Sequence, residues 1–269
     1  MREVVQLGNL DLALASLLVL LAGGLSLALR LGVTAQLFIA ALRMLVQLSL
    51  MGLVLKTLFT LVSPWLTALA AAVMLLFAGR EVMGRQTRPL KGLWTYGLGT
   101  GAMTLAATLV TVLALSVTLR ADPWYHPAYA LPLLGMVLGN CMTGTALALE
   151  RLTEGAAKER AAIEARLALG HDRVRAFSSV VRQAVRAGIM PVVNAMSAMG
   201  LVFLPGMLTG QILAGQPAEQ AVRYQILVMF LIAGGTALGV LSITLAAAAR
   251  LTDGRHRLRL DRLKTPEGG

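Results

Sequence analysis

Long apolar stretches, separated by shorter polar segments, follow one another along most of this chain. Seven of them reach about 20 residues, the length that an α-helix needs to cross the hydrocarbon core of a bilayer. An open strand would leave its backbone groups without partners in lipid, so each stretch is predicted to be a transmembrane helix. The predicted spans are Leu10–Leu29, Thr34–Leu55, Leu58–Gly79, Leu93–Leu119, Tyr125–Leu149, Ala187–Leu213 and Tyr224–Ala249.

The composition supports a membrane protein and excludes other classes. Of 269 residues, 57% are hydrophobic and 14% are charged, and the mean hydropathy is +0.74. This leaves too little polar surface for a water-soluble globule, and none for a solvated nucleic-acid interface, although the formal net charge is +11. The single cysteine, Cys141, excludes a disulfide within one chain and a multi-cysteine metal site. We expect one all-α transmembrane domain over residues 1–269.

The charged residues lie between the spans and divide unevenly between the two sides of the membrane. The connections on one side hold 19 basic and 9 acidic residues, whereas those on the other side, with the N-terminus, hold four of each. Because basic residues accumulate on the cytoplasmic side, the N-terminus is predicted outside and the C-terminus in the cytoplasm. This side also suits contact with anionic lipid headgroups. The basic connections are Arg30, the segments 80–91 and 150–186, and the tail 250–269.

Arg43 is the one basic residue inside a predicted span, and Gln47 follows it one turn later on the same helix face. Two interpretations stay open for Arg43. Its side chain either snorkels to the cytoplasmic interface or forms a buried cation that is structural or faces a substrate. We expect no acidic partner for it, because Asp11 at an outer edge is the only acidic residue in a predicted span.

The polar segment 150–186 contains an apolar stripe with helical spacing, at alternating intervals of four and three residues. Glu164 and five arginines lie off this stripe. An amphipathic helix of this kind either lies on the membrane surface or docks onto a soluble partner, and the pattern allows both. The stripe consists of Ile163, Leu167, Gly170, Val174, Phe177, Val181 and Ala184.

The heptapeptide from Glu164 to Gly170 resembles the Glu-Ala-Ala-x-x-x-Gly loop of ABC-transporter permeases. In those proteins a short cytoplasmic helix inserts into a cleft of the ATPase subunit. The Ile-Met-Pro sequence at 189–191 lies about two helical turns later than the corresponding part of that loop, which is a departure from the pattern. The resemblance implies a role in ATPase coupling for Glu164, Ala165, Gly170, Phe177 and Val181.

Polar side chains interrupt the fifth and sixth spans near the middle of the membrane. Asn140, Cys141 and Thr143 form one polar step, and Asn194 and Ser197 form another. Polar side chains in lipid bond across helices, so this layer is the predicted lining of a substrate pathway. The full predicted set is Arg43, Gln47, Asn140, Cys141, Met142, Thr143, Asn194, Pro205, Gly206 and Gln211.

Three further features each have two interpretations. Pro205 and Gly206 interrupt the sixth span, either as a broken helix beside a cavity or as a plain helix end near the outer face. The 13 methionines either offer thioether ligands to a soft metal or fill packing gaps, so metal ligands stay unassigned. GxxxG spacings serve helix packing within the chain or contact between two copies. These pairs are Gly97–Gly101, Gly135–Gly139, Gly206–Gly210 and Gly235–Gly239.

Several chemical signatures are missing from the sequence, and their absence narrows the class. The chain has no P-loop motif and no Gly-Lys dipeptide, so it does not cradle ATP as a P-loop does. No histidine pair has metal-ligand spacing on one helix face. No span carries a mid-membrane carboxylate or a protease constellation, which disfavours an ion-coupled carrier and an enzyme. We expect no cofactor in this chain, and ATP and Mg on a partner subunit.

Four stretches resemble the FetB family of ABC-transporter permeases: Leu37–Leu48, Met136–Asn140, Gly200–Gly215 and Tyr224–Leu227. The Leu-Pro-Gly-Met-x-Thr-Gly-Gln block within the third stretch is the most specific. The family comprises bacterial permeases implicated in iron export and plant relatives linked to aluminium tolerance and nucleotide-sugar transport. The resemblance implies a permease of the bacterial inner membrane, a separately encoded P-loop ATPase and a homodimer. A different substrate, such as a nucleotide sugar, and a self-sufficient channel or scaffold are the alternatives.

Overall fold

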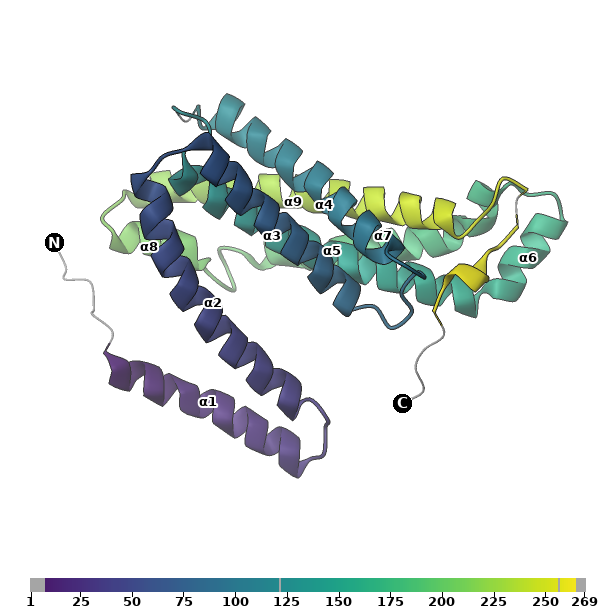
Figure 1. Ribbon diagram of the computed structural model, residues 1–269, viewed down its shortest axis with the longest axis horizontal. Coiled ribbons are helices and arrows are strands. Elements are labelled where there is room, and N and C mark those ends of the chain that lie inside the picture. Colours follow the sequence, from purple (N-terminus) through teal and green to yellow (C-terminus); the bar gives the residue numbers. More distant parts are fainter. Residues whose placement is uncertain (1–7, 121, 256, 265–269) are drawn as a thin grey trace.

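The computed structural model describes residues 8–120, 122–255 and 257–264, and this part of the chain is helical apart from turns, loops and isolated β-bridges (Figure 1). The prediction of an all-α fold is therefore confirmed. A π-helical turn, Ala114–Thr118, continues α4, and a 3₁₀ turn spans Leu260–Arg262. The α-helices are α1 (Asn9–Ala28), α2 (Thr34–Thr60), α3 (Pro64–Gly84), α4 (Trp94–Leu113), α5 (Pro127–Lys158), α6 (Arg160–Ala168), α7 (Arg173–Ala198), α8 (Gly206–Leu213) and α9 (Ala218–Arg250).

Six of the described helices are long and apolar enough to cross a membrane: α1, α2, α3, α4 with its π-helical continuation, α5 and α9. Each overlaps one predicted span, although the predicted span Leu58–Gly79 begins inside α2 and its helix, α3, starts at Pro64. The protein is a multi-pass membrane protein. Three of them are longer than predicted: α2 has 27 residues, α5 has 32 and α9 has 33, and the last two are the longest. At about 1.5 Å per residue α5 and α9 are each about 50 Å long, so both extend beyond a hydrocarbon core of about 30 Å.

The predicted span Ala187–Leu213 is not one continuous helix. Helix α7 ends at Ala198, and α8 begins at Gly206 after a loop. Gly200 in this loop has a φ of +88°, a left-handed conformation that glycine adopts without steric cost. The break thus precedes Pro205, which the sequence identified as the interruption and which adopts an extended conformation immediately before α8. The membrane part of this segment is divided between the end of α7 and the short α8.

Helix α5 is the centre of a bundle formed with α3, α4, α7 and α9, and glycines allow its closest contacts. A Cβ added to Gly188 of α7 would lie 2.6 Å from the carbonyl oxygen of Gly144 in α5. One added to Gly239 of α9 would lie 2.3 Å from Sγ of Cys141, and Gly235 is similarly tight. The Gly235–Gly239 spacing therefore packs helices within the chain. Among the glycines of the predicted GxxxG pairs, those with open space around an added Cβ are Gly97, Gly101, Gly139, Gly206 and Gly210.

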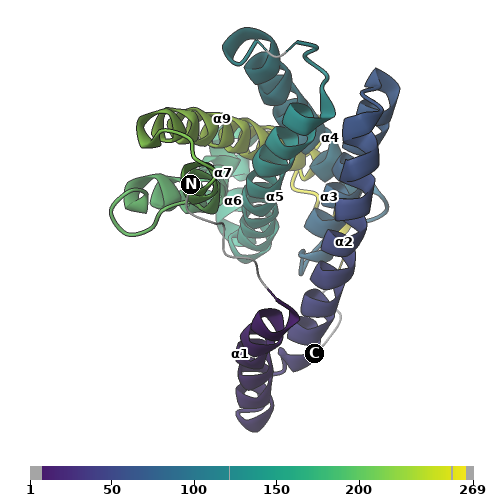
Figure 2. The same ribbon diagram turned by 90° about the vertical axis from the view of Figure 1, so that its left-hand side faces the viewer.

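Helices α1 and α2 form an arm that projects from this bundle (Figures 1 and 2). The two helices hold each other through Gly23, which is packed against the Phe38 ring, and through a 2.9 Å hydrogen bond from Thr34 Oγ1 to Ser26 Oγ. In the most apolar 18-residue window of α2 no residue is buried within the chain. The surface of this α1–α2 arm is thus free to contact lipid or another protein.

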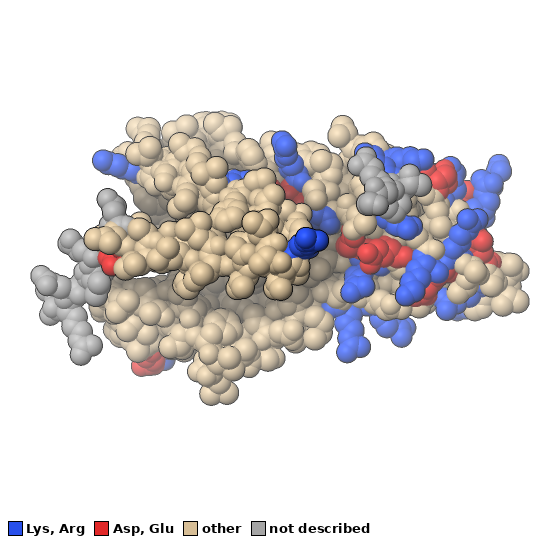
Figure 3. All heavy atoms as spheres, turned by 90° about the horizontal axis from the view of Figure 1, so that it is seen from below, with Lys and Arg blue, Asp and Glu red and all other residues tan. Residues whose placement is uncertain are grey.

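The charged residues gather at one end of the molecule, beyond the apolar part (Figure 3). This charged end contains the end of α5, α6, the first half of α7 and the residues after α9. The C-terminal residues fold back: the Lys91 amide donates to the Arg262 carbonyl over 2.7 Å, and the Lys264 amide donates to the Pro89 carbonyl over 2.9 Å. The described part of the predicted basic tail is therefore attached to the α3–α4 connection.

Candidate functional site

Arg43 on α2 forms an ion pair with Glu81 on α3. The expectation that Arg43 lacks an acidic partner is wrong, because α3 continues to Gly84 and places Glu81 in its last turn. The Arg43 and Glu81 side chains are 48% and 32% exposed. In a membrane an ion pair is far less costly than an isolated charge, so this pair supports the join between the α1–α2 arm and the bundle. Gln47, one turn further along α2, is exposed.

The predicted pathway residues 140–143 of α5 point in different directions, because successive residues on a helix are about 100° apart. Cys141 is fully buried, with its Sγ 3.7 Å from the Gly235 carbonyl oxygen, and Met142 is partly buried. Asn140 is exposed and donates from Nδ2 to the Met136 carbonyl over 2.9 Å. In this conformation Cys141 packs α5 against α9 and lines no open surface.

Four polar residues remain on the outer sides of α5 and α7: Asn140, Thr143, Asn194 and Ser197. The two hydroxyls donate to backbone carbonyls one turn earlier in their own helices, over 3.2 Å for Thr143 and 2.9 Å for Ser197. Because α5 and α7 run antiparallel through the Gly144–Gly188 contact, Asn140 and Asn194 lie about 6 and 9 Å beyond it on the same side. We call these four residues the polar layer.

The polar layer has unused hydrogen-bonding capacity at a depth where lipid offers no partner. Asn140 lies well inside α5, whose outer part begins at Pro127 and whose charged part begins at Glu150. Asn194 is exposed on α7. Leaving amide groups against hydrocarbon costs several kcal/mol per unsatisfied group. The layer therefore fits a surface that meets water, a substrate or a second protein surface.

The other predicted pathway residues lie in two separate places. Arg43 and Gln47 are on the α1–α2 arm, whereas Pro205, Gly206 and Gln211 belong to the start and middle of α8. Figure 2 shows α8 on the side of the bundle away from α2. The structure therefore does not bring the arm residues and the α8 residues together. Pro205 and Gln211 are partly buried, and Gly206 is exposed.

The segment predicted as one amphipathic helix is a helical hairpin. Helix α6 ends before Gly170, whose φ is +87°, and Asp172 caps α7 by accepting a 2.7 Å hydrogen bond from the Arg175 amide. The apolar stripe turns inward: Ile163 is fully buried and Phe177 is 2% exposed. Phe177 therefore cannot touch a partner in this conformation, because its side chain is buried within the chain, and Val181 is partly buried.

The hairpin exposes the turn 169–172 together with the neighbouring parts of α6 and α7, and we call this surface the tip. Glu164, Ala165 and Gly170 are exposed there, and Glu164 pairs with Arg160 over 2.9 Å. Leu169 and Val174 are 79% and 73% exposed. Val174 belongs to the predicted stripe, but Leu169 does not and was missed, because only the loop geometry turns it outward. Such large apolar side chains in the charged, aqueous part of the molecule have no lipid to cover them.

Six continuous apolar helices, a polar layer at mid-depth and a charged end outside the apolar part define a multi-pass helical membrane protein. No group of three or more His, Cys, Asp or Glu residues suited to a metal ion occurs within the described ranges. The profile of the Uncharacterised protein family (UPF0014) matches residues 9–252, and the chain belongs to this family. No solved structure matches the chain.

The relatives include proteins of bacteria and plants. A UPF0014 membrane protein of Synechocystis sp. is 39% identical over 80% of this chain and 82% of its own length. The UPF0014 membrane protein STAR2 of Oryza sativa subsp. japonica is 33% identical, covering 85% and 78%. The probable iron export permease protein FetB of Escherichia coli is 29% identical over 95% of this chain and 96% of its own length. The resemblance to the FetB family is confirmed, and the protein is a multi-pass inner-membrane protein of a permease family.

Proposed function

We propose that this chain is the membrane permease subunit of an ABC exporter, and that it moves iron or another metal ion. ATP hydrolysis would take place on a separate P-loop ATPase, because this sequence has no P-loop of its own. The name of the Escherichia coli relative supports the permease role and the choice of iron as the first substrate to test. The observation that carries the proposal is the exposed apolar tip, with Leu169 and Val174 among charged residues.

Hydrogen bonds join α6 to α7 near the tip, so a movement of the ATPase subunit would displace both helices together. Arg166 Nη1 on α6 donates to the Ala176 carbonyl over 3.1 Å and to Ser179 Oγ over 2.9 Å. Glu159 accepts from Ser179 and from Gln183, both over 3.2 Å. Ile163 of α6 and Phe177 of α7 are both buried. Together with the hydrogen bonds, this burial would keep α6 and α7 in a fixed relative position.

Helix α7 carries that motion into the membrane. It runs without interruption from Arg173 to Ala198, about 39 Å, and ends just after Asn194. Its closest contact with α5, at Gly188, lies between the tip and the polar layer. Movement of the tip would therefore tilt α7 about this contact and change the access to Asn194. In this proposal Phe177 and Val181 act through packing, and Glu164, Ala165 and Gly170 lie at the ATPase contact.

A second copy of the chain would complete the pathway. The polar layer lies on the outside of a single chain, where lipid cannot satisfy it. A second copy that covers the outer sides of α5 and α7 at this level would enclose Asn140 and Asn194 and leave a polar route between the copies. The excess of basic residues at the charged end supports a cytoplasmic location for the tip, which is where an ATPase would bind.

The decisive experiment is co-purification of the tagged chain with its ATPase from the native membrane. Val174→Glu and Leu169→Glu are expected to remove most of the ATPase from the complex, because each places a charge on the apolar contact. Leu201→Glu is the matched control, since Leu201 is 94% exposed at the opposite end of α7. If both tip variants keep a full complement of ATPase, the tip is not the docking surface. Metal content of cells with and without the pair, compared for several metals, tests the substrate, and unchanged metal levels would contradict metal export.

A further inference from the structure

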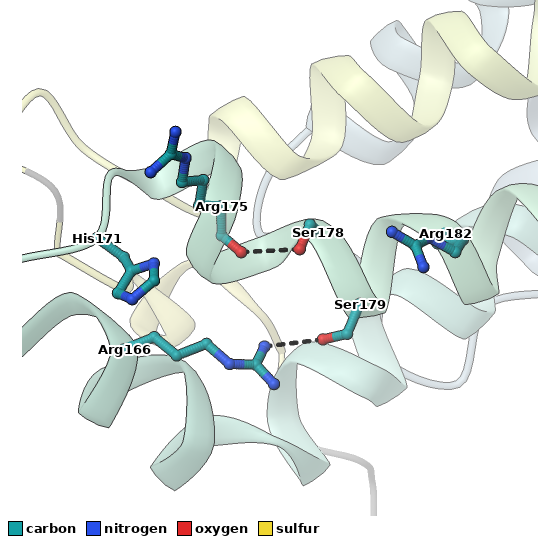
Figure 4. A pocket seen from close by; sticks show the side chains of 6 residues that line it. All are labelled: Arg166, His171, Arg175, Ser178, Ser179 and Arg182. Carbon is teal, nitrogen blue, oxygen red and sulfur yellow. Dashed lines mark hydrogen bonds between the residues drawn. The ribbon is translucent and has the colours of Figure 1, made fainter. Parts of the chain in front are cut away.

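A basic pocket lies between α6 and the first half of α7, beside the tip (Figure 4). It is an open pocket of about 480 Å³, and no carboxylate of the described residues lines it. Figure 4 shows the Arg166 side chain crossing from α6 toward Ser179 on α7, with His171 in the connecting turn. The lining residues are Arg166, His171, Arg175, Ser178, Ser179 and Arg182.

Two of these arginines form no ion pair with any residue that the structure describes. Arg175 and Arg182 are seven residues apart, so they lie on the same face of α7, and both are exposed. Within the described ranges neither guanidinium has an ion-pair or hydrogen-bond partner. The neighbouring Asp172 carboxylate accepts from the Arg175 backbone amide. Glu159 does not line the pocket, and its carboxylate accepts from the lining residue Ser179 and from Gln183.

The third arginine is held in place. Two hydrogen bonds from Arg166 Nη1 fix the guanidinium against α7, and its other N–H groups remain for a ligand. The hydroxyls of Ser178 and Ser179 also line the pocket, but they donate to the Arg175 carbonyl and the Glu159 carboxylate, so the free donors belong to the arginines. Concentrated positive charge in a concave surface attracts anions, and forked guanidinium donors match the oxygens of a phosphate group. A carboxylate would use fewer of these donors.

We propose that this pocket binds a phosphate group, supplied either by an anionic lipid headgroup or by a soluble phosphate ester. The position of the pocket permits both sources. Arg186 is the last charged residue before α7 becomes apolar, so Arg182, one turn away, lies at headgroup level. Arg175 is about 10 Å further from the membrane and faces the aqueous side. The proposal needs no ATPase, so it stands or falls separately from the transport function.

The test uses the purified full-length chain and a double variant, Arg175→Gln/Arg182→Gln. Its matched control is Arg85→Gln/Arg255→Gln, which removes two exposed charges from the same end of the molecule outside the pocket. In one arm, inorganic phosphate and a phosphomonoester are titrated at constant ionic strength, with thermal unfolding as the readout. In the other, native mass spectrometry counts phosphatidylglycerol retained from mixed phosphatidylglycerol and phosphatidylcholine membranes.

We expect the pocket variant to weaken binding by at least about tenfold in one arm, since each lost charge-assisted contact is worth that much or more, and the control variant to bind normally. If the pocket variant loses only the binding measured in the phosphate titration, the ligand is a soluble phosphate ester. If it loses only the retention of phosphatidylglycerol, the ligand is a lipid headgroup. Arg182→Lys keeps the positive charge but loses the forked guanidinium, and its binding is expected to lie between that of the parent and that of the double variant. This milder substitution keeps the proposal testable if the double variant fails to fold. Equal behaviour of pocket and control variants in both arms would overturn the proposal.

Discussion

Gly144 and Gly188 show how single residues set the distance between two helices. Their backbones approach so closely that neither position has room for a side chain. In lipid, such contacts replace the hydrophobic driving force that packs soluble helices. The proposed motion of α7 depends on this contact, because it is the point where α7 bears on α5.

Gly188→Ala tests the contact. The added Cβ would lie 2.6 Å from the Gly144 carbonyl oxygen, so the helices must separate, at a cost of about 1–3 kcal/mol in the free energy of unfolding. We expect a lower thermal unfolding midpoint in detergent. Gly234→Ala, with no atom within 4 Å of the new Cβ, is the control and is expected to unfold as the parent does. A normal midpoint for Gly188→Ala would contradict the packing described.

The Arg43–Glu81 pair yields a second test at this scale. Arg43→Leu leaves Glu81 without its partner, and we expect it to lower the amount of folded protein and abolish transport. If the pair is purely structural, Arg43→Leu/Glu81→Leu recovers both, because no unpaired charge remains. Expression and metal export are measured together for the single and double variants. A double variant that folds normally but does not transport would instead assign Arg43 a role toward the substrate.

At the scale of elements, the C-terminal residues are held by charge. Asp253 accepts hydrogen bonds from the Arg257 and Arg255 amides over 2.9 and 3.0 Å, and pairs with the Arg257 side chain. The backbone hydrogen bond from Arg257, opposed by some desolvation, lowers the pKa of Asp253 below its ordinary value. Bonds from Arg259 lower the pKa of Asp261 to about 2. These contacts shape the turn that returns the chain to Leu90.

This predicts an acid-sensitive attachment. Because the folded-state pKa values lie below the unfolded ones, the stabilisation is present above about pH 4 and is lost as the pH falls toward 2. Amide hydrogen exchange of Lys91 and Lys264, corrected for intrinsic rates, is expected to accelerate relative to α9 over that range. Asp253→Asn removes part of the pH dependence. Exchange that stays constant relative to α9 would show that these carboxylates do not hold the turn.

The sequence predicted the membrane helices well because their signal is local: an apolar stretch of sufficient length is visible without knowing its neighbours. Features that depend on neighbours were harder to predict. The stripe through Phe177 shows that one helix face is apolar, but only the packing reveals that this face is buried within the chain. The pairing of Glu81 with Arg43 required knowing that α3 continues one turn past Gly79 and lies beside α2. Likewise, the separation of Cys141 from Asn140 depends on where α9 packs.

For the whole molecule, the charge distribution makes a prediction about orientation. Val174→Cys and Trp124→Cys place exposed thiols at opposite ends of the described structure, while the native Cys141 is buried. An impermeant maleimide is expected to label Trp124→Cys from outside the cell and Val174→Cys only in inverted vesicles. The reverse pattern would invert the topology and place the tip out of reach of a cytoplasmic ATPase.

Assembly is the other prediction at this scale. In a Cys141→Ser background, Asn194→Cys on the polar layer is expected to give a crosslinked dimer with a short bifunctional reagent. Leu109→Cys, which is exposed on α4, serves as the control and is expected to remain monomeric. Equal crosslinking from both positions, or from neither, would count against a dimer that meets on the polar layer.

The loose attachment of the α1–α2 arm has a consequence for how the protein is made. The arm is a self-contained hairpin, and a connection of three residues, 61–63, separates it from α3. It can therefore insert into the membrane during synthesis before the bundle has formed. The ion pair between Arg43 and Glu81 then forms once α3 has been synthesised. A gene divided within this connection should yield two polypeptides that find each other in the bilayer and reconstitute the intact subunit.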